Sequence, residues 1–304
     1  MIQLPHGPFA CNGQSEVYYP SASHERARIE GLSCLGDGER VFLLEGPSGA
    51  GKTTLIRQIL RHPGAAGEIL TIPMGLSLNR RELLQALLFD CHLPMEGSEM
   101  ELRLRLMDFV GTNLAQGRSV WITGDGAIGL GNDCFEELML LTSMQGRMSS
   151  RVQLVIASDD IRTSRIFEGN DFQPANIVLE PWPMNELADL LKQRLSLIGM
   201  VTEMEDILRD EVLEALVPDK FAFPGTILGL ARMAWRLGLA ESAHNLDVEL
   251  ILQAREIQEA KIEKFKHESR WPLPQATNSQ HGTYSMSKSE DLFGRPVSVP
   301  GAWD

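Results

Sequence analysis

The sequence is poor in cysteine, in long apolar runs and in basic charge. Its four cysteines, Cys11, Cys34, Cys91 and Cys134, lie far apart and form no C-x-x-C pair. This spacing argues against a zinc site or a disulfide framework and favours a reducing compartment. No apolar run approaches the roughly 18 residues that a membrane-spanning helix needs. The segment 1–11 has neither the basic start nor the apolar stretch of a signal peptide. These absences predict a cytoplasmic protein without a transmembrane segment.

Acidic residues outnumber basic ones. The chain has 41 Asp and Glu against 28 Lys and Arg, which gives a formal net charge of −13. This balance argues against a broad nucleic-acid-binding surface, although a local basic patch is compatible with an acidic protein. The 304 residues suffice for one large or two modest domains, and a hydrophobic content of 43% suffices for a sizeable core.

A glycine-rich run near residue 50 carries the strongest chemical signal in the chain. It fits the pattern G-x-x-x-x-G-K-[ST] of a phosphate-binding loop. A buried-strand pattern at 41–44 precedes it and an amphipathic helix pattern follows it, which disfavours a chance match. Glycines let the backbone wrap around a phosphate, and amides at a helix start point at the anion. We therefore predict a nucleotide site at Gly46, Pro47, Ser48, Gly49, Ala50, Gly51, Lys52, Thr53 and Thr54.

Three side chains are predicted to complete this site. Lys52 is expected to reach the β- and γ-phosphates of ATP, and the Thr53 hydroxyl to bind Mg²⁺. A P-loop NTPase also needs an acidic residue at the end of a second strand, which holds Mg²⁺ through water. Asp125 follows the strand pattern at 120–123 and is the best candidate. Asp-Gly is also a strong turn dipeptide, so a plain turn at Asp125-Gly126 is the alternative.

Five short apolar segments separated by helical patterns predict a parallel sheet with helices on both faces, as in P-loop NTPases. The segments are 41–44, 69–72, 120–123, 152–157 and 177–179. Ser23 is predicted to cap a helix at 23–35. Capping boxes are predicted to open three later helices, at Asn79-x-x-Glu82, Ser98-x-x-Glu101 and Asp133-x-x-Glu136.

The pattern changes after Pro183. Helical periods alone follow, at 184–199, 205–217, 225–239 and 247–267, with Asp247 as the N-cap of the last. Beyond Trp271 the chain is rich in Pro, Ser and Gly, a composition typical of disorder. We predict a nucleotide-binding domain at 1–183, an all-helical lid domain at 184–269 and a disordered tail at 270–304.

These motifs resemble those of the ExeA/GspA group of AAA+ ATPases, which is linked to the general secretion pathway and has relatives in pilus biogenesis. The resemblance spans roughly residues 7–265 and rests on five stretches: Gly7-Pro8-Phe9, Tyr19–His24, Gly46–Thr54, Asp125–Leu130 and Leu179–Pro183. It implies the AAA+ fold with a helical lid, ATP and Mg²⁺ as ligands, and a protein partner in a larger assembly. Homo-oligomers occur among AAA+ relatives.

The chain departs from the family where relatives place catalytic groups. Hydrolytic members carry a Glu directly after the metal-binding Asp, and here that residue is Gly126. Ser158 stands where the family has a polar sensor residue. The resemblance thus assigns catalytic roles to Lys52, Asp125 and Ser158. Glu45, just before the loop, is a weaker candidate to approach the γ-phosphate.

Arginines are also missing from two family positions. The stretch Phe172–Asn176 stands where an arginine finger is expected, and Phe223–Gly225 stands where the lid carries a sensor arginine. Arg232 and Arg236 follow on the next helix and are the available substitutes. A missing base and missing arginines favour nucleotide binding over fast turnover.

Three functions stay open at this point. The first is an ATPase that drives assembly of a secretion or pilus machine. The second, which Gly126 favours, is a nucleotide-dependent switch or binding module with slow hydrolysis. The third is a DNA-associated ATPase of the transposition type, which the charge of −13 disfavours.

Overall fold

The computed structural model describes residues 8–9, 18–62, 67–73, 78–125, 131–159, 174–240 and 246–268, with the backbone alone at residues 125 and 262–268. The chain divides into two compact units, Met1–Glu259 and Ala260–Asp304. The predicted tail at 270–304 lies outside the described residues, as does Gly126. Within the described part of the chain, no helix is long and apolar enough to cross a membrane.

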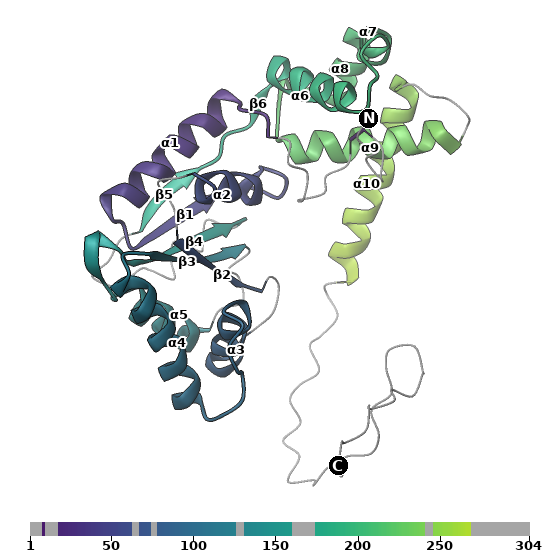
Figure 1. The fold of residues 1–304 in the computed structure, drawn as a ribbon. Coiled ribbons are helices and arrows are strands. Elements are labelled where there is room, and N and C mark those ends of the chain that lie inside the picture. The colour runs from purple at the N-terminus through teal and green to yellow at the C-terminus, as the bar shows by residue number, and fades with distance from the viewer. Residues whose placement is uncertain are drawn as a thin grey trace, which may run out of the picture. The chain divides into compact units, whose positions relative to one another are not determined.

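A five-stranded parallel sheet forms the centre of the first unit (Figure 1). Its strands are β1 (Val41–Glu45), β2 (Gly67–Ile72), β3 (Ser119–Asp125), β4 (Val152–Ser158) and β5 (Ala175–Val178). Their order is β2-β3-β4-β1-β5, and every neighbouring pair is parallel. All five predicted strands are present, so the predicted fold class is confirmed.

Helices cover both faces of this sheet, as Figure 1 shows. One face packs against α1 (Ala22–Asp37) and α2 (Lys52–Leu60), and the other against α3 (Arg80–Asp90), α4 (Glu99–Ala115) and α5 (Asn132–Thr142). Successive residues of β1 join different cores, because side chains alternate across a strand. Val41 and Leu43 pack in the α3–α5 layer, whereas Phe42 and Leu44 pack in the α1–α2 layer.

A helical region follows the sheet. It contains α6 (Met184–Leu197), α7 (Met204–Ile207), α8 (Asp210–Leu216), α9 (Pro224–Ala240) and α10 (Val248–Glu268). Its buried residues form a hydrophobic core of their own, which Phe9 joins by packing edge-on against Trp235. A separate core is what a lid domain needs. The boundary at residue 183 stays a prediction.

Two predictions about this helical region were wrong. Helical periods alone were expected, but β7 (Phe221–Ala222) pairs antiparallel with β6 (Trp182–Pro183). A helix was expected over 205–217, but α7 and α8 are separate helices. Arg209 between them has extended backbone angles, φ −63° and ψ 155°. The break places Ile207 and Leu208 in the core together with the apolar face of α8.

Local capping signals succeeded at two of the three predicted boxes. Both backbone–side-chain bonds of the box are present at Asn79/Glu82 and at Ser98/Glu101. The third box is absent because α5 begins at Asn132 after Gly131, and Asp133 lies inside its first turn. The Asp133 and Glu136 carboxylates lie instead near Arg80 of α3, at 4.0 and 3.2 Å.

The start of α1 and the start of α10 differ in how well the sequence predicted them. Ser21, not Ser23, caps α1, because the Ser21 backbone is extended and its hydroxyl accepts the His24 N–H. Ser23 already lies in the first turn. At α10 the Asp247 carboxylate accepts the Glu249 N–H at 3.0 Å, as the predicted N-cap should.

Candidate nucleotide-binding site

The glycine-rich run forms a tight turn between β1 and α2. The Gly46 N–H donates to the Ser158 carbonyl of β4 at 3.1 Å, and the Ala50 N–H donates to the Pro47 carbonyl at 3.0 Å. Gly51 then directly precedes the first residue of α2. The order of strand, turn and helix therefore places the first amides of α2 at the carboxyl edge of the sheet, where phosphate groups bind in open α/β folds.

Two of the loop glycines adopt backbone angles that other residues avoid. Gly49 has φ +83° and Gly51 has φ +94°, both in the left-handed region. Each also lies close to another element: a Cβ on Gly49 would be 3.0 Å from the Thr226 nitrogen, and a Cβ on Gly51 would be 2.5 Å from His24 Nε2. Glycine at these positions thus satisfies both the turn and its packing.

Lys52 is buried within the loop that it follows. Its side chain is 6% exposed, and its ammonium donates to the Gly46 carbonyl at 2.7 Å and to the Pro47 carbonyl at 3.0 Å. A third contact is an ion pair with the Asp159 carboxylate. An ammonium has three protons, so three protein acceptors account for all of them. A phosphate that binds Lys52 must therefore replace one of these acceptors.

The predicted metal ligands lie at the same edge of the sheet. Asp125 is the last residue of β3, and its Cα pairs in register with Ala157 of β4. Glu45 at the end of β1 pairs in register with Ser158. Thr53, half-buried, lies in the first turn of α2 beside Lys52. The strand ends thus bring the Asp125 backbone and the loop to one edge, while the Asp125 side chain lies outside the described residues.

Ser158 at the end of β4 and Glu45 at the end of β1, both candidate site residues from the sequence, are buried. The Ser158 side chain, predicted to be a sensor, is fully buried. Glu45 is also buried, and its carboxylate accepts the Asn176 side-chain N–H at 3.1 Å, toward β5. Asp159 is the residue that reaches Lys52, and the sequence analysis missed it. Its position directly after a strand that neighbours β1 is the signal that could have found it.

The helical region contacts the loop directly. The Gly225 N–H in the first turn of α9 donates to the Gly49 carbonyl at 2.8 Å. A Cβ on Gly225 would come within 2.7 Å of the Gly49 Cα, so this close approach requires glycine. Phe223–Gly225, which lacks the expected arginine, is thus where the helical region contacts the loop. Arg232 is half-buried and Arg236 exposed on the same helix.

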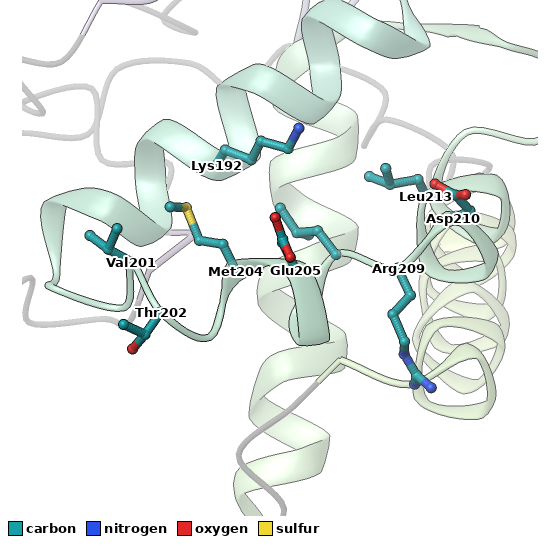
Figure 2. A pocket seen from close by; sticks show the side chains of 9 residues that line it. Lys192, Val201, Thr202, Met204, Glu205, Arg209, Asp210 and Leu213 are labelled. Carbon is teal, nitrogen blue, oxygen red and sulfur yellow. The ribbon is translucent and has the colours of Figure 1, made fainter.

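A hollow lies within the helical region, away from the predicted site residues. Its volume is about 790 Å³, and Figure 2 shows its walls on α6, α7 and α8 and on the turn before α7. Both charge signs line it, with Lys192 and Arg209 against Glu205 and Asp210. None of the residues predicted to bind nucleotide belongs to its lining.

The residues present fit a nucleoside triphosphate and a divalent cation. The positive-φ glycines shape the turn that leads into the first amides of α2, Lys52 supplies the cation, and Thr53 supplies a hydroxyl next to it. Mg²⁺ takes few protein ligands and keeps several waters, so a hydroxyl and one carboxylate suffice. Among the described residues, no group of three or more His, Cys, Asp and Glu is placed to hold a metal ion by itself.

Comparison with known proteins agrees with this geometry. The AAA domain family matches residues 36–162. General secretion pathway protein A of Aeromonas hydrophila is 31% identical over 155 residues, which are 50% of this chain and 28% of that protein. The match thus spans under a third of that relative's length.

Solved structures share the fold. Cdc6p from Pyrobaculum aerophilum has a TM-score of 0.62 at 14% identity, over 82% of this chain and 70% of its own. The Aeropyrum pernix ORC1 protein in complex with DNA has a TM-score of 0.60 at 19% identity, over 86% of this chain and 72% of its own. Sequence motifs, loop geometry and these matches agree: residues 36–162 match an AAA domain on a P-loop NTPase fold, and half of the chain is similar to general secretion pathway protein A.

Proposed function

We propose that this protein binds ATP with Mg²⁺ at Gly46–Thr54 and hydrolyses it slowly, and that it acts as a nucleotide-dependent switch or assembly factor. The observation that carries the proposal is the buried Lys52 ammonium beside a loop with two positive-φ glycines, at the start of α2. A fixed cation and converging amides are what a triphosphate needs.

Each proposed site residue has one role. The amides of the loop bind the phosphates, and Lys52 neutralises charge on the β- and γ-phosphates. Thr53 and Asp125 hold Mg²⁺, which spreads the phosphate charge when bound. Ser158 remains the proposed sensor residue: its side chain is fully buried, and its carbonyl accepts the Gly46 N–H of the loop at 3.1 Å.

Slow hydrolysis follows from the residue after Asp125. Gly126 has no side chain, so the chain lacks a carboxylate at the position where hydrolytic relatives polarise the attacking water. A positioned general base contributes about 10²–10⁴-fold to a rate. The lid contact through Gly225 also supplies no arginine charge to the phosphates. Binding should therefore survive while turnover stays low.

The proposed partner is a protein of a secretion or pilus-type machine. The support is the 31% identity to general secretion pathway protein A, which covers only part of each protein. A switch needs two conformations that a ligand distinguishes. The contact between Gly49 of the loop and Gly225 of the lid is a place where bound nucleotide would change lid position.

Calorimetry with MgATP tests the binding site. Wild type should bind, and Lys52→Ala should lose most of the affinity while the fold stays intact, because water can hydrate the Gly46 and Pro47 carbonyls. Thr226→Ala, which changes a neighbour of the loop and no predicted ligand, is the matched control. Equal affinity in wild type and Lys52→Ala would refute the site. Salt-dependent binding of duplex DNA would instead favour a DNA-associated ATPase.

A further inference from the structure

His24 lies between the phosphate loop and the start of the helical region. It sits in the first turn of α1 and is 2% exposed. Its ring packs edge-on against the Trp182 ring, with centroids 4.8 Å apart, and Trp182 Nε1 donates to His24 Nδ1 at 2.7 Å. On the other side of the ring, Nε2 lies against the position where a Cβ of Gly51 would stand. One side chain thus touches both the loop and β6, which pairs with β7 at the start of the helical region; we call these two strands the lid hinge.

The Trp182 contact fixes the protonation of this ring. An indole N–H can only donate, so His24 Nδ1 must carry a lone pair. Burial lowers the pKa of His24 to about 4, and the nearby Ala50 backbone and Glu25 carboxylate oppose part of this shift. The ring is therefore neutral near pH 7 and carries its proton on Nε2, which faces the loop.

The Nε2 proton of His24 lacks a well-placed hydrogen-bond acceptor among the described residues. Among the described residues, Nε2 makes no hydrogen bond of standard geometry, although the Ala50 backbone is near enough to affect its pKa. A buried donor without a good acceptor is costly, and a small shift of the loop toward it would relieve that cost. The quality of this contact therefore depends on the conformation of the loop.

A second path joins the same two parts of the molecule. Trp182 of β6 pairs in register with Ala222 of β7, and three residues later Gly225 donates to the Gly49 carbonyl. The loop thus meets this region at two points: Gly51 packs against His24, which accepts from Trp182 of β6, and Gly49 accepts from Gly225 at the start of α9. A change in the loop must alter one or both of these contacts.

We infer that His24 is a positioning residue that couples the phosphate loop to the lid hinge, through Nε2 at Gly51 and Nδ1 at Trp182. The relevance of this coupling to nucleotide binding rests on the function proposed above. The coupling itself is a property of the protein alone, so its test uses no nucleotide and its failure is distinct from a failure to bind ATP.

Amide hydrogen exchange of residue 46 and of residues 48–53 measures the coupling. Trp182→Phe keeps the aromatic ring but removes the donor to His24. We expect this change to speed exchange of the loop amides about fivefold, the weight of one ordinary hydrogen bond. Exchange of the β3 amides serves as the control for global unfolding.

Two substitutions of His24 separate its two ends. His24→Asn keeps an acceptor near the Nδ1 position, and His24→Gln keeps a donor near the Nε2 position, but neither bridges both. In either background Trp182→Phe should leave loop exchange within twofold. An equal fivefold effect in all backgrounds would show that the loop senses Trp182 by another route and would overturn the inference.

A measurement on the wild type keeps the inference testable if the variants do not fold. NMR of protein with ¹⁵N-labelled histidine reports which ring nitrogen carries the proton. The proton on Nε2 of His24 at pH 7 is the expected result. A proton on Nδ1 would exclude the bond from Trp182 and with it the proposed coupling.

Discussion

Substitution of Asp159 should strengthen nucleotide binding. The Asp159 carboxylate pairs with the Lys52 ammonium, whose other two protons are held by the Gly46 and Pro47 carbonyls. A phosphate and Asp159 are both anions and require the same ammonium. Asp159→Asn keeps the size of the side chain and removes its charge, so the phosphate would meet a weaker competitor.

The size of this effect follows from burial. Lys52 is 6% exposed but the Asp159 side chain is 49% exposed, so water screens much of the attraction. Half-exposed ion pairs contribute at most about 1 kcal/mol. Loss of this competitor corresponds to a Kd for MgATP that is about fivefold lower. The gain should shrink as ionic strength rises, because salt screens the pair.

Isothermal titration of MgATP into wild type and Asp159→Asn measures the change. Asp160→Asn removes the same charge one residue further along and controls for the overall field of the acidic chain. A tighter Kd in Asp159→Asn alone is the expected result. Unchanged or weaker binding in Asp159→Asn would refute the competition, and weaker binding would place the carboxylate among the groups that hold the magnesium.

Three further predictions concern turnover, pH and packing. Gly126→Glu should raise phosphate release by less than the 10²–10⁴-fold of a well-placed base, because arginine charge is also lacking; turnover of wild type at rates that Gly126→Glu does not improve would contradict this. His24 has a folded pKa of about 4, below its ordinary 6.5, so the unfolded chain binds more protons between these values. The free energy of unfolding should therefore fall by about 3 kcal/mol from pH 6.5 to 4, and His24→Gln should remove that part of the urea-denaturation profile. The buried Glu137 carboxylate accepts two bonds from Arg103, at 2.8 and 2.5 Å, so Glu137→Ala should cost about 3 kcal/mol in urea unfolding. The double variant with Arg103→Ala should cost less than the sum of the single changes, and strict additivity would argue against the pair.

The sequence by itself determined the elements whose signals are local. The phosphate loop, the five strands and two capping boxes depend on residues within a few positions of one another, so a pattern suffices to predict them. The sequence also predicted that glycines in the loop allow its tight turn, whereas the close approach of Thr226 to Gly49 and of His24 to Gly51 became visible only in the structure. The parallel arrangement followed from strands that alternate with helices.

Only the tertiary structure decided which distant residues complete the site. Asp159 lies 107 residues from Lys52, and Trp182 lies 158 residues from His24. Neither pair leaves a periodic or spacing signal in the sequence. The first depends on which strands become neighbours in the sheet, and the second depends on where β6 packs against α1. The missed break at Arg209 and the missed β7 have the same cause: burial of residues against a distant core outweighed the local helical preference.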